Sequence, residues 1–81
     1  FEQLEVEAVS PFVGRKLSET NIRSQLNIVI VSIRRTSGEI VFNPSADATI
    51  EAGDMLIAIG NAEALAQLTA LARGQTTKLA V

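Results

Sequence analysis

Cysteine, histidine, tryptophan and tyrosine are all absent from this 81-residue chain. The lack of cysteine excludes disulfides and thiolate metal sites and is compatible with a reducing cytosol. The lack of histidine removes the commonest general base and most transition-metal sites. Aromatic residues make up only 4% of the sequence, whereas hydrophobic residues make up 47%. The core must therefore consist of isoleucine, valine, leucine and alanine.

Long apolar runs and a basic charge excess are also missing. The longest apolar runs, Ile28–Ile33 and Met55–Ile59, are far shorter than the roughly 20 residues that cross a bilayer. The formal net charge of −2 argues against nucleic-acid binding, which usually needs a basic face. A domain of this size buries only about 60–65% of the surface of its unfolded chain, which favours an oligomer or attachment to a larger parent. The start at Phe1, without an initiator methionine, likewise favours a fragment.

The stretch Ala52–Gly60 is the strongest candidate for the centre of the fold. Five apolar residues, Met55–Ile59, lie between the turn pair Gly53 and Asp54 and the closing glycine. This pattern predicts a central strand buried on both faces. The Asp54 side chain is expected to accept hydrogen bonds from N–H groups of the turn, so we interpret the Gly53-Asp54 pair as structural.

Three further stretches have strand character. Over Leu4–Val9, the residues Leu4, Val6 and Ala8 alternate with Glu5, Glu7 and Val9, which is the period of two expected of a strand with one wetter face. Asn27–Arg35 is rich in β-branched residues and is predicted to be a central strand. The turn Thr36–Gly38 then leads into a return strand over Glu39–Phe42, which predicts a β-hairpin.

Two helices are predicted. Lys16–Ser24 is expected to form one short helix with its last turn near Asn21–Ser24. Asn61 is a suitable N-cap for a longer helix whose apolar residues repeat at helical spacing until Gly74. We therefore expect an α+β fold of order β-α-β-β-β-α, with a four-stranded, mostly antiparallel sheet and both helices on one face. Residues 1–74 form the predicted domain and residues 75–81 a flexible C-terminal tail.

No catalytic constellation stands out, and we predict that the chain is not an enzyme. Glu5 and Glu7 share one face of the predicted first strand, and paired carboxylates can act as acid and base, but a solvated strand face explains them more readily. Arg34 and Arg35 at the hairpin mouth could hold an anion, although two solvated charges are the favoured interpretation. The glycines match no phosphate-binding motif, and the scattered carboxylates match no metal loop.

Several segments, in this order and spacing, resemble the TrkA-C domain, the C-terminal half of the regulatory unit that controls conductance of potassium. The resemblance covers essentially Leu4 to Leu71 and includes the structural signature residues Gly14, Gly53, Asp54 and Gly60. The segments that carry it are Ser10–Leu17, Ile22-Arg23, Ile28–Arg35, Asn43-Pro44 and Ala52–Gly60.

The resemblance implies a homodimeric cytoplasmic domain attached to a membrane-embedded potassium channel or transporter. Such domains sense a small ligand or ion and transmit dimer movement to the pore; some bind cyclic di-AMP between two subunits. No cofactor is required and no nucleic-acid partner is expected. A purely structural dimerisation domain, with no ligand of its own, is the alternative.

The resemblance also implies a ligand site. Its acidic-Ile-Arg-small segment falls on Asn21 to Ser24, so that Asn21 stands where the family has an acid. In the next strand Val29 stands where cyclic di-AMP binders often have asparagine. We expect Arg23 to carry the binding of an anion, because its guanidinium suits phosphate; an exposed helix-end cation is the competing interpretation. The full set of implied ligand residues is Asn21, Ile22, Arg23, Ser24, Val29, Ile30 and Pro44.

Overall fold

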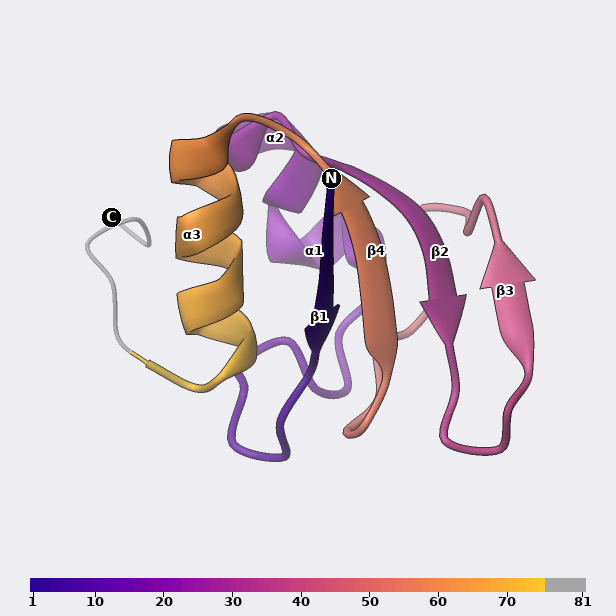
Figure 1. Ribbon diagram of the computed structural model, residues 1–81. Helices are drawn as coiled ribbons and strands as arrows, with labels where there is room; N and C mark the ends of the chain where they lie inside the picture. The colour runs from indigo at the N-terminus through magenta and orange to yellow at the C-terminus, as the bar shows by residue number, and fades with distance from the viewer. Residues whose placement is uncertain (76–81) are drawn as a thin grey trace.

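A four-stranded antiparallel sheet with three helices forms the fold, in a computed structural model that describes residues 1–75 (Figure 1). The strand order is β1-β4-β2-β3, and every neighbouring pair is antiparallel. The predicted α+β class is therefore confirmed. The elements are β1 (Glu2–Glu5), α1 (Leu17–Thr20), α2 (Ile22–Leu26), β2 (Val29–Arg34), β3 (Ile40–Phe42), β4 (Met55–Ile59) and α3 (Ala62–Ala72).

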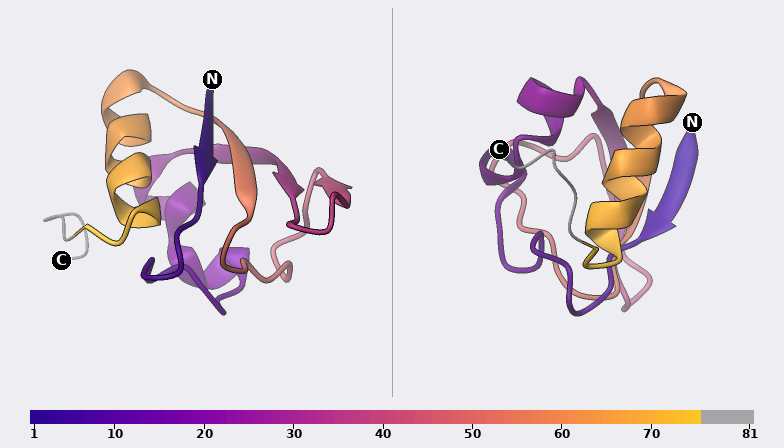
Figure 2. Two further views of the ribbon diagram at one scale, coloured as in Figure 1. Left: turned by 60° about the horizontal axis from the view of Figure 1, so that its bottom comes forward. Right: turned by 90° about the vertical axis from the view of Figure 1, so that its left-hand side faces the viewer.

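Strand β4 lies in the middle of the sheet, as its apolar sequence predicts. Leu56 and Ala58 are fully buried beneath the helices, but Ile59 on the opposite face is 53% exposed. The prediction that this strand is buried on both faces is therefore wrong. All three helices lie on one side of the sheet (Figure 2). Within residues 1–75 no helix covers the other face.

Helix α3 covers the sheet with the residues that its periodicity predicts. Asn61 caps it, because its Oδ1 accepts a hydrogen bond from the N–H of Ala64 at 2.7 Å. Leu65, Leu68 and Ala72 point into the core. The helix ends before Gly74, and the N–H of Gln75 donates to the carbonyl oxygen of Ala70 at 2.9 Å. The rest of the predicted tail, residues 76–81, lies outside the described residues.

The single short helix predicted over Lys16–Ser24 is in fact two helices. Asn21 separates them because its backbone is left-handed, with φ of 61°, a conformation that asparagine tolerates better than most residues. The Thr20 hydroxyl bridges the break, donating to the carbonyl of Leu17 at 2.7 Å and accepting the N–H of Ile22 at 3.3 Å. After the break, Ile22 and Arg23 of α2 lie beside the start of β2.

The first strand is shorter than predicted and ends at Glu5. Val6 is still buried and forms two backbone hydrogen bonds with the turn before β4. Its N–H donates to the carbonyl of Asp54 at 2.8 Å, and its carbonyl accepts a hydrogen bond from the N–H of Gly53 at 2.7 Å. The N–H of Glu7 then donates to the carbonyl of Ala72 at 2.8 Å. The chain thus leaves β4 for the end of α3, and Glu5 and Glu7 do not share a strand face.

The hairpin of β2 and β3 forms as predicted, but its two arginines differ. Arg34 is exposed, whereas the Arg35 side chain is only 16% exposed and forms an ion pair with Asp54, which is 1% exposed. Arg35 Nη1 also donates to the carbonyl of Thr49 at 2.8 Å, and Asp54 Oδ2 accepts the N–H of Glu51 at 2.8 Å. The prediction of two solvated charges is wrong for Arg35, because the turn before β4 folds over its guanidinium.

Two register details shape the middle of the sheet. Between Ile30 and Ser32 the pairing of β2 with β4 shifts, so Val31 is an extra residue in β2. At the end of β4, Gly60 lies against Ile28; a Cβ at this glycine would come within 2.8 Å of Ile28 Cγ1. This close approach brings the residue before β2 onto the end of β4.

Candidate ligand-binding site

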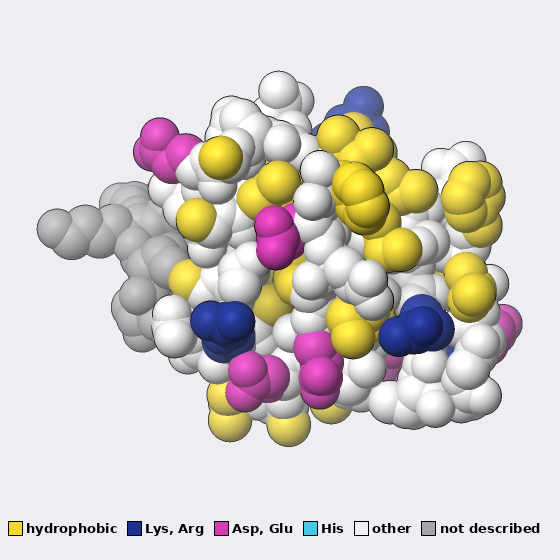
Figure 3. Space-filling model, viewed as in Figure 1, with side chains coloured by type: hydrophobic (Ala, Val, Ile, Leu, Met, Phe, Trp, Pro, Cys, Tyr) yellow, Lys and Arg dark blue, Asp and Glu magenta, His cyan; other side chains and the backbone are white. Residues whose placement is uncertain are grey.

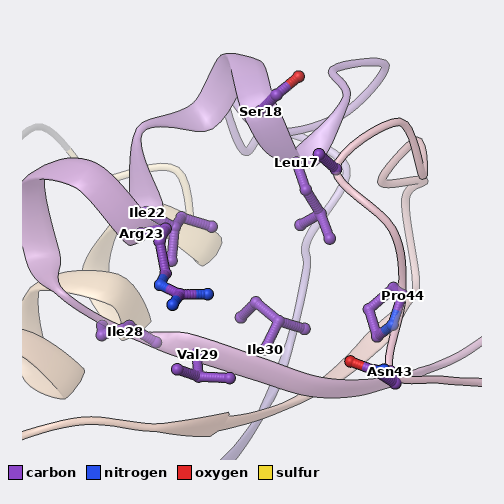
Figure 4. A pocket seen from close by; sticks show the side chains of 10 residues that line it. Leu17, Ser18, Ile22, Arg23, Ile28, Val29, Ile30, Asn43 and Pro44 are labelled. Carbon is purple, nitrogen blue, oxygen red and sulfur yellow. The ribbon is translucent and has the colours of Figure 1, made fainter.

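A cavity of about 210 Å³ lies between the two short helices and the beginning of β2 (Figure 4). It is formed by three parts of the chain that are distant in sequence: the helical pair, the start of β2 and the segment that follows β3. Its lining residues are Leu17, Ser18, Ile22, Arg23, Ile28, Val29, Ile30, Asn43, Pro44 and Ala46.

The floor and one wall of the cavity are apolar. Ile28 and Ile22 are buried and anchor the floor to the core, while Val29 remains partly exposed beside them. Leu17 and Pro44 face them from the other side (Figure 4). An apolar surface of this kind offers flat contact to an uncharged ring rather than solvation to an ion.

Arg23 supplies the one charge among the residues that line this cavity. It is the second residue of α2, and its guanidinium points down toward β2, between Ile22 and Val29 (Figure 4). Within residues 1–75 it has no carboxylate partner closer than 4.0 Å, since the ion pair found there joins Arg35 to Asp54. An exposed guanidinium beside apolar walls is suited to a phosphate or carboxylate of a ligand.

The rim opposite Arg23 is held by backbone contacts between distant segments. The N–H groups of Leu17 and Ser18 donate to the carbonyls of Ala48 and Ala46, both at 2.9 Å. The N–H of Asn43 donates to the carbonyl of Val31 at 2.8 Å, and its own backbone is left-handed, with φ of 52°. These bonds fix the chain around Pro44 beside the cavity.

Most of the residues expected in a ligand site are brought together here. Ile22, Arg23, Val29, Ile30 and Pro44 all line the cavity. The other two expected residues, Asn21 and Ser24, lie outside its lining. The Ser24 hydroxyl is 3.5 Å from Asn21 Oδ1. Asn21 borders a second hollow of about 210 Å³, which is also lined by Phe12 and Leu71.

Sequence reasoning did not assign the remaining lining residues to the site. Leu17, Ser18 and Ala46 come together only because the segment after β3 folds back onto α1, where Lys16 and Thr49 form an isolated bridge. No periodicity or motif marks such a contact between two irregular segments. Asn43 was detectable in principle, since it precedes Pro44, a residue that already belonged to the expected set.

Residues 1–75 contain no group of three or more carboxylates placed to hold a metal ion. Every helix in this part of the chain is too short or too polar to span a bilayer.

The profile of the TrkA-C domain matches residues 1–73 of this sequence, nearly its whole length. The chain belongs to the TrkA-C family. The match includes every described helix and strand and all residues that line the cavity. The boundary predicted at residue 74 stays a prediction, although the match ends close to it.

Two curated relatives are transport proteins by name. This TrkA-C chain is 41% identical over 68 residues to an uncharacterised transporter of Rhodopirellula baltica, covering 83% of the chain and 12% of the transporter. It is 31% identical over 67 residues to the K⁺/H⁺ antiporter subunit KhtT of Bacillus subtilis, covering 83% of the chain and 41% of the subunit. The chain thus spans less than half the length of either relative.

Solved structures share the fold. The RCK_C domain dimer of Streptococcus agalactiae BusR in complex with c-di-AMP superposes with a TM-score of 0.80 at 21% identity, covering 99% of this chain and 94% of that one. The RCK C domain of the potassium transport protein KtrA, also in complex with cyclic diadenosine monophosphate, gives 0.71 at 29% identity, with coverage of 84% and 79%. BusR with promoter DNA gives 0.80 at 23%, with coverage of 90% and 35%.

Proposed function

We propose that this TrkA-C domain is a regulatory module that binds a small anionic ligand, forms a homodimer, and couples binding to gating of an ion-transport protein. The observation that carries the proposal is the Arg23 guanidinium, without a carboxylate partner in the described residues, above an apolar floor. That combination needs a ligand with both a negative charge and an apolar or aromatic surface. It is not the arrangement of a general acid, a base or a nucleophile.

A nucleotide with a phosphodiester, such as cyclic di-AMP, has both properties. Its phosphate would accept hydrogen bonds from Arg23, and a base would lie on the apolar surface of Ile30 and Pro44. The ligand named for the BusR and KtrA domains supports this choice. Val29 provides apolar contact in the second strand and no amide donor, so we expect weaker recognition of the base edges than an asparagine would allow.

The size of the cavity supports a ligand shared by two subunits. A volume of about 210 Å³ is below the roughly 300–1,000 Å³ of pockets that enclose a small molecule. Two copies facing each other across the cavity would reach that range together. A ligand can favour the open or the closed state of the parent transport protein only if it binds one arrangement of the dimer more tightly than the other. The size of that difference in affinity limits how far the equilibrium shifts.

The parent is proposed to be a transport protein, with this domain on its cytoplasmic side. The two curated relatives, both named for transport, support this assignment. BusR is bound to DNA in one of its structures. We still expect no nucleic-acid contact by the present domain, because the present chain has a net negative charge. A ligand-free structural dimerisation domain remains the second candidate, supported by apolar side chains exposed on the uncovered sheet face (Figure 3), such as Ile59 at 53%.

Thermal unfolding followed by circular dichroism tests the ligand. We expect cyclic di-AMP at 100 times its dissociation constant to stabilise the domain by about 2.7 kcal/mol. Arg23→Gln should weaken binding at least about tenfold in titration calorimetry, since it removes a charge-assisted hydrogen bond. Arg34→Gln is the matched control, because Arg34 is exposed and does not line the cavity.

Two results would overturn the proposal. If no nucleotide or divalent cation in a broad panel shifts the unfolding temperature, the structural dimerisation domain becomes the better assignment. If Arg34→Gln weakens binding as much as Arg23→Gln, the effect is long-range charge and not contact in the cavity.

A further inference from the structure

Three polar side chains are found among the residues that line the cavity, those of Ser18, Arg23 and Asn43. The Ser18 hydroxyl points away from the cavity, whereas the Arg23 guanidinium points down toward β2 (Figure 4). Arg23 is the cation that the proposed function assigns to a phosphate. Asn43 is therefore the polar side chain of the lining that is left to recognise the rest of a ligand.

The side-chain amide of Asn43 is accessible. The residue is exposed, and the side-chain hydrogen bonds formed within residues 1–75 do not include its amide. Figure 4 shows the amide beside the ring of Pro44, with its oxygen on the side of Ile30. An asparagine amide has a carbonyl acceptor and an amino donor, so both are open to a ligand.

The backbone of Asn43 is held in place although its side chain is open. Its N–H donates to the carbonyl of Val31 at 2.8 Å, and its φ of 52° lies in the left-handed region. The ring of Pro44 restricts the chain directly after it. Glycine adopts a left-handed backbone more readily than asparagine does, so this turn by itself does not require an amide side chain.

Two other asparagines with a left-handed backbone lie at helix ends. Asn21 separates α1 from α2, and Asn27 ends α2, where its N–H donates to the carbonyl of Arg23 at 3.1 Å. Asparagine is a common residue at such helix ends, and neither of these two lines the cavity. Asn43 follows a strand instead, and of the three it is the one that borders the cavity.

We propose that Asn43 is a specificity-determining residue that selects adenine over guanine in the nucleotide ligand; this rests on the proposed function. The base lies on the apolar surface of Ile30 and Pro44, and the edge that carries N7 meets the amide of Asn43. Adenine presents an acceptor, N7, next to a donor, the N6 amino group. The amide of Asn43 complements both, because it donates to N7 and accepts from N6.

Guanine does not fit the same amide. Its N7 and O6 are both acceptors, so the amino group of Asn43 satisfies one of them while the amide oxygen faces the other. A bidentate pair of this kind discriminates against the wrong base by roughly 5- to 150-fold. Val29 has no polar side-chain group, so the choice between the two purines depends on Asn43.

Titration calorimetry with cyclic di-AMP and cyclic di-GMP tests this assignment, because the two nucleotides share the ribose–phosphate ring and differ only in the base. The wild-type chain should bind cyclic di-AMP at least about fivefold more tightly than cyclic di-GMP. Asn43→Gly keeps the left-handed turn and removes the amide. It should weaken cyclic di-AMP at least about fivefold and leave cyclic di-GMP nearly unchanged, so that the ratio of the two affinities falls toward one.

Asn27→Gly is the matched control. Asn27 is also exposed and left-handed, with φ of 56°, but it does not line the cavity. The same exchange at this position should keep the wild-type ratio of affinities. Circular dichroism of each variant checks that it is folded.

A change in the ligand tests the same hydrogen bond with the protein unchanged. The 7-deaza analogue of cyclic di-AMP has a C–H group in place of N7 and cannot accept from Asn43. It should bind the wild-type chain at least about fivefold more weakly than cyclic di-AMP does. To Asn43→Gly the two nucleotides should bind equally, because the partner of N7 is already gone.

The outcomes separate this assignment from the proposed function. If both nucleotides bind but Asn43→Gly leaves their ratio unchanged, or if the 7-deaza analogue binds the wild type as tightly as cyclic di-AMP, Asn43 does not read the base and the ligand site still stands. Equal effects of Asn27→Gly and Asn43→Gly would also overturn the assignment, since the loss would then come from backbone freedom. If neither nucleotide binds, the proposed function fails and the role of Asn43 fails with it.

Discussion

Replacing Asp54 with alanine removes the acceptor at the centre of the turn before β4. Its carboxylate, 1% exposed, accepts hydrogen bonds from the Arg35 guanidinium and from the N–H of Glu51. The variant leaves Arg35 charged and largely buried, with the carbonyl of Thr49 as its remaining acceptor. Breaking a buried pair from one side costs about 3–5 kcal/mol. Arg35 keeps some contact with water, so we expect about 3 kcal/mol.

That loss is large against the roughly 5–15 kcal/mol of stability typical of a domain. Urea denaturation followed by circular dichroism should show a lower midpoint with an unchanged slope. The melting temperature should fall by roughly 12–24 °C, at about 4–8 °C per kcal/mol for this chain length. Arg34→Met is the control, since an exposed arginine outside any pair should change stability by no more than about 0.5 kcal/mol.

A double-mutant cycle identifies the cause of the loss. In Arg35→Met combined with Asp54→Ala, no unpaired charge remains, so the double variant should be less destabilised than the sum of the two single variants. A coupling energy of about 1–3 kcal/mol is expected. Additive effects, or a cost below 1 kcal/mol for Asp54→Ala, would refute the reasoning, since the turn would then not depend on this ion pair.

The remaining predictions concern two neighbouring residues, Gly60 at the end of β4 and Asn61 at the start of α3, and their effect on stability. Gly60→Ala should lower the free energy of unfolding by about 1–3 kcal/mol, because the added methyl group would lie only 2.8 Å from Cγ1 of buried Ile28. The backbone of Gly60 has no positive φ, so alanine causes no backbone strain there. A variant that is more stable than the wild type in urea denaturation would show that Ile28 can move aside. Asn61→Ala should lower the free energy of unfolding by about 1 kcal/mol, because it removes the N-cap of α3. Asn61→Ser should retain most of the stability, since serine can also cap a helix. If the two variants lose equal stability in thermal melts, the capping hydrogen bond is not the cause.

The elements with a clear periodicity could be predicted from the sequence. The apolar run of β4, the β-branched residues of β2 and the helical spacing before Gly74 each depend on neighbours within one element. Local chemistry was less decisive at Asn21. Asparagine is tolerated both inside a short helix and in the left-handed conformation that splits it, and packing of Ile22 and Leu26 into the core selects the second.

Features that depend on contacts between distant segments were missed. The sequence pattern around Arg35 shows two adjacent basic residues at a turn, and nothing local indicates that the turn at Asp54 folds over one of them. The same limit applies to the open face beside Ile59, since an apolar run alone does not reveal how many layers cover it. For the cavity, the resemblance supplied Arg23 and Pro44, while the contribution of Ala46 depended on the fold.

The extra residue in β2 has a mechanical consequence. Val29 and Ile30 precede the bulge and form the cavity floor, whereas the residues after it pair with β3. A bulged strand is bent at the extra residue, so the bend lies between the cavity floor and the ladder that holds β3. The carbonyl of Val31, within the bulge, also accepts the N–H of Asn43 at the cavity rim. If the proposed ligand binds at this floor, the bend at Val31 would connect its position with that of the sheet edge.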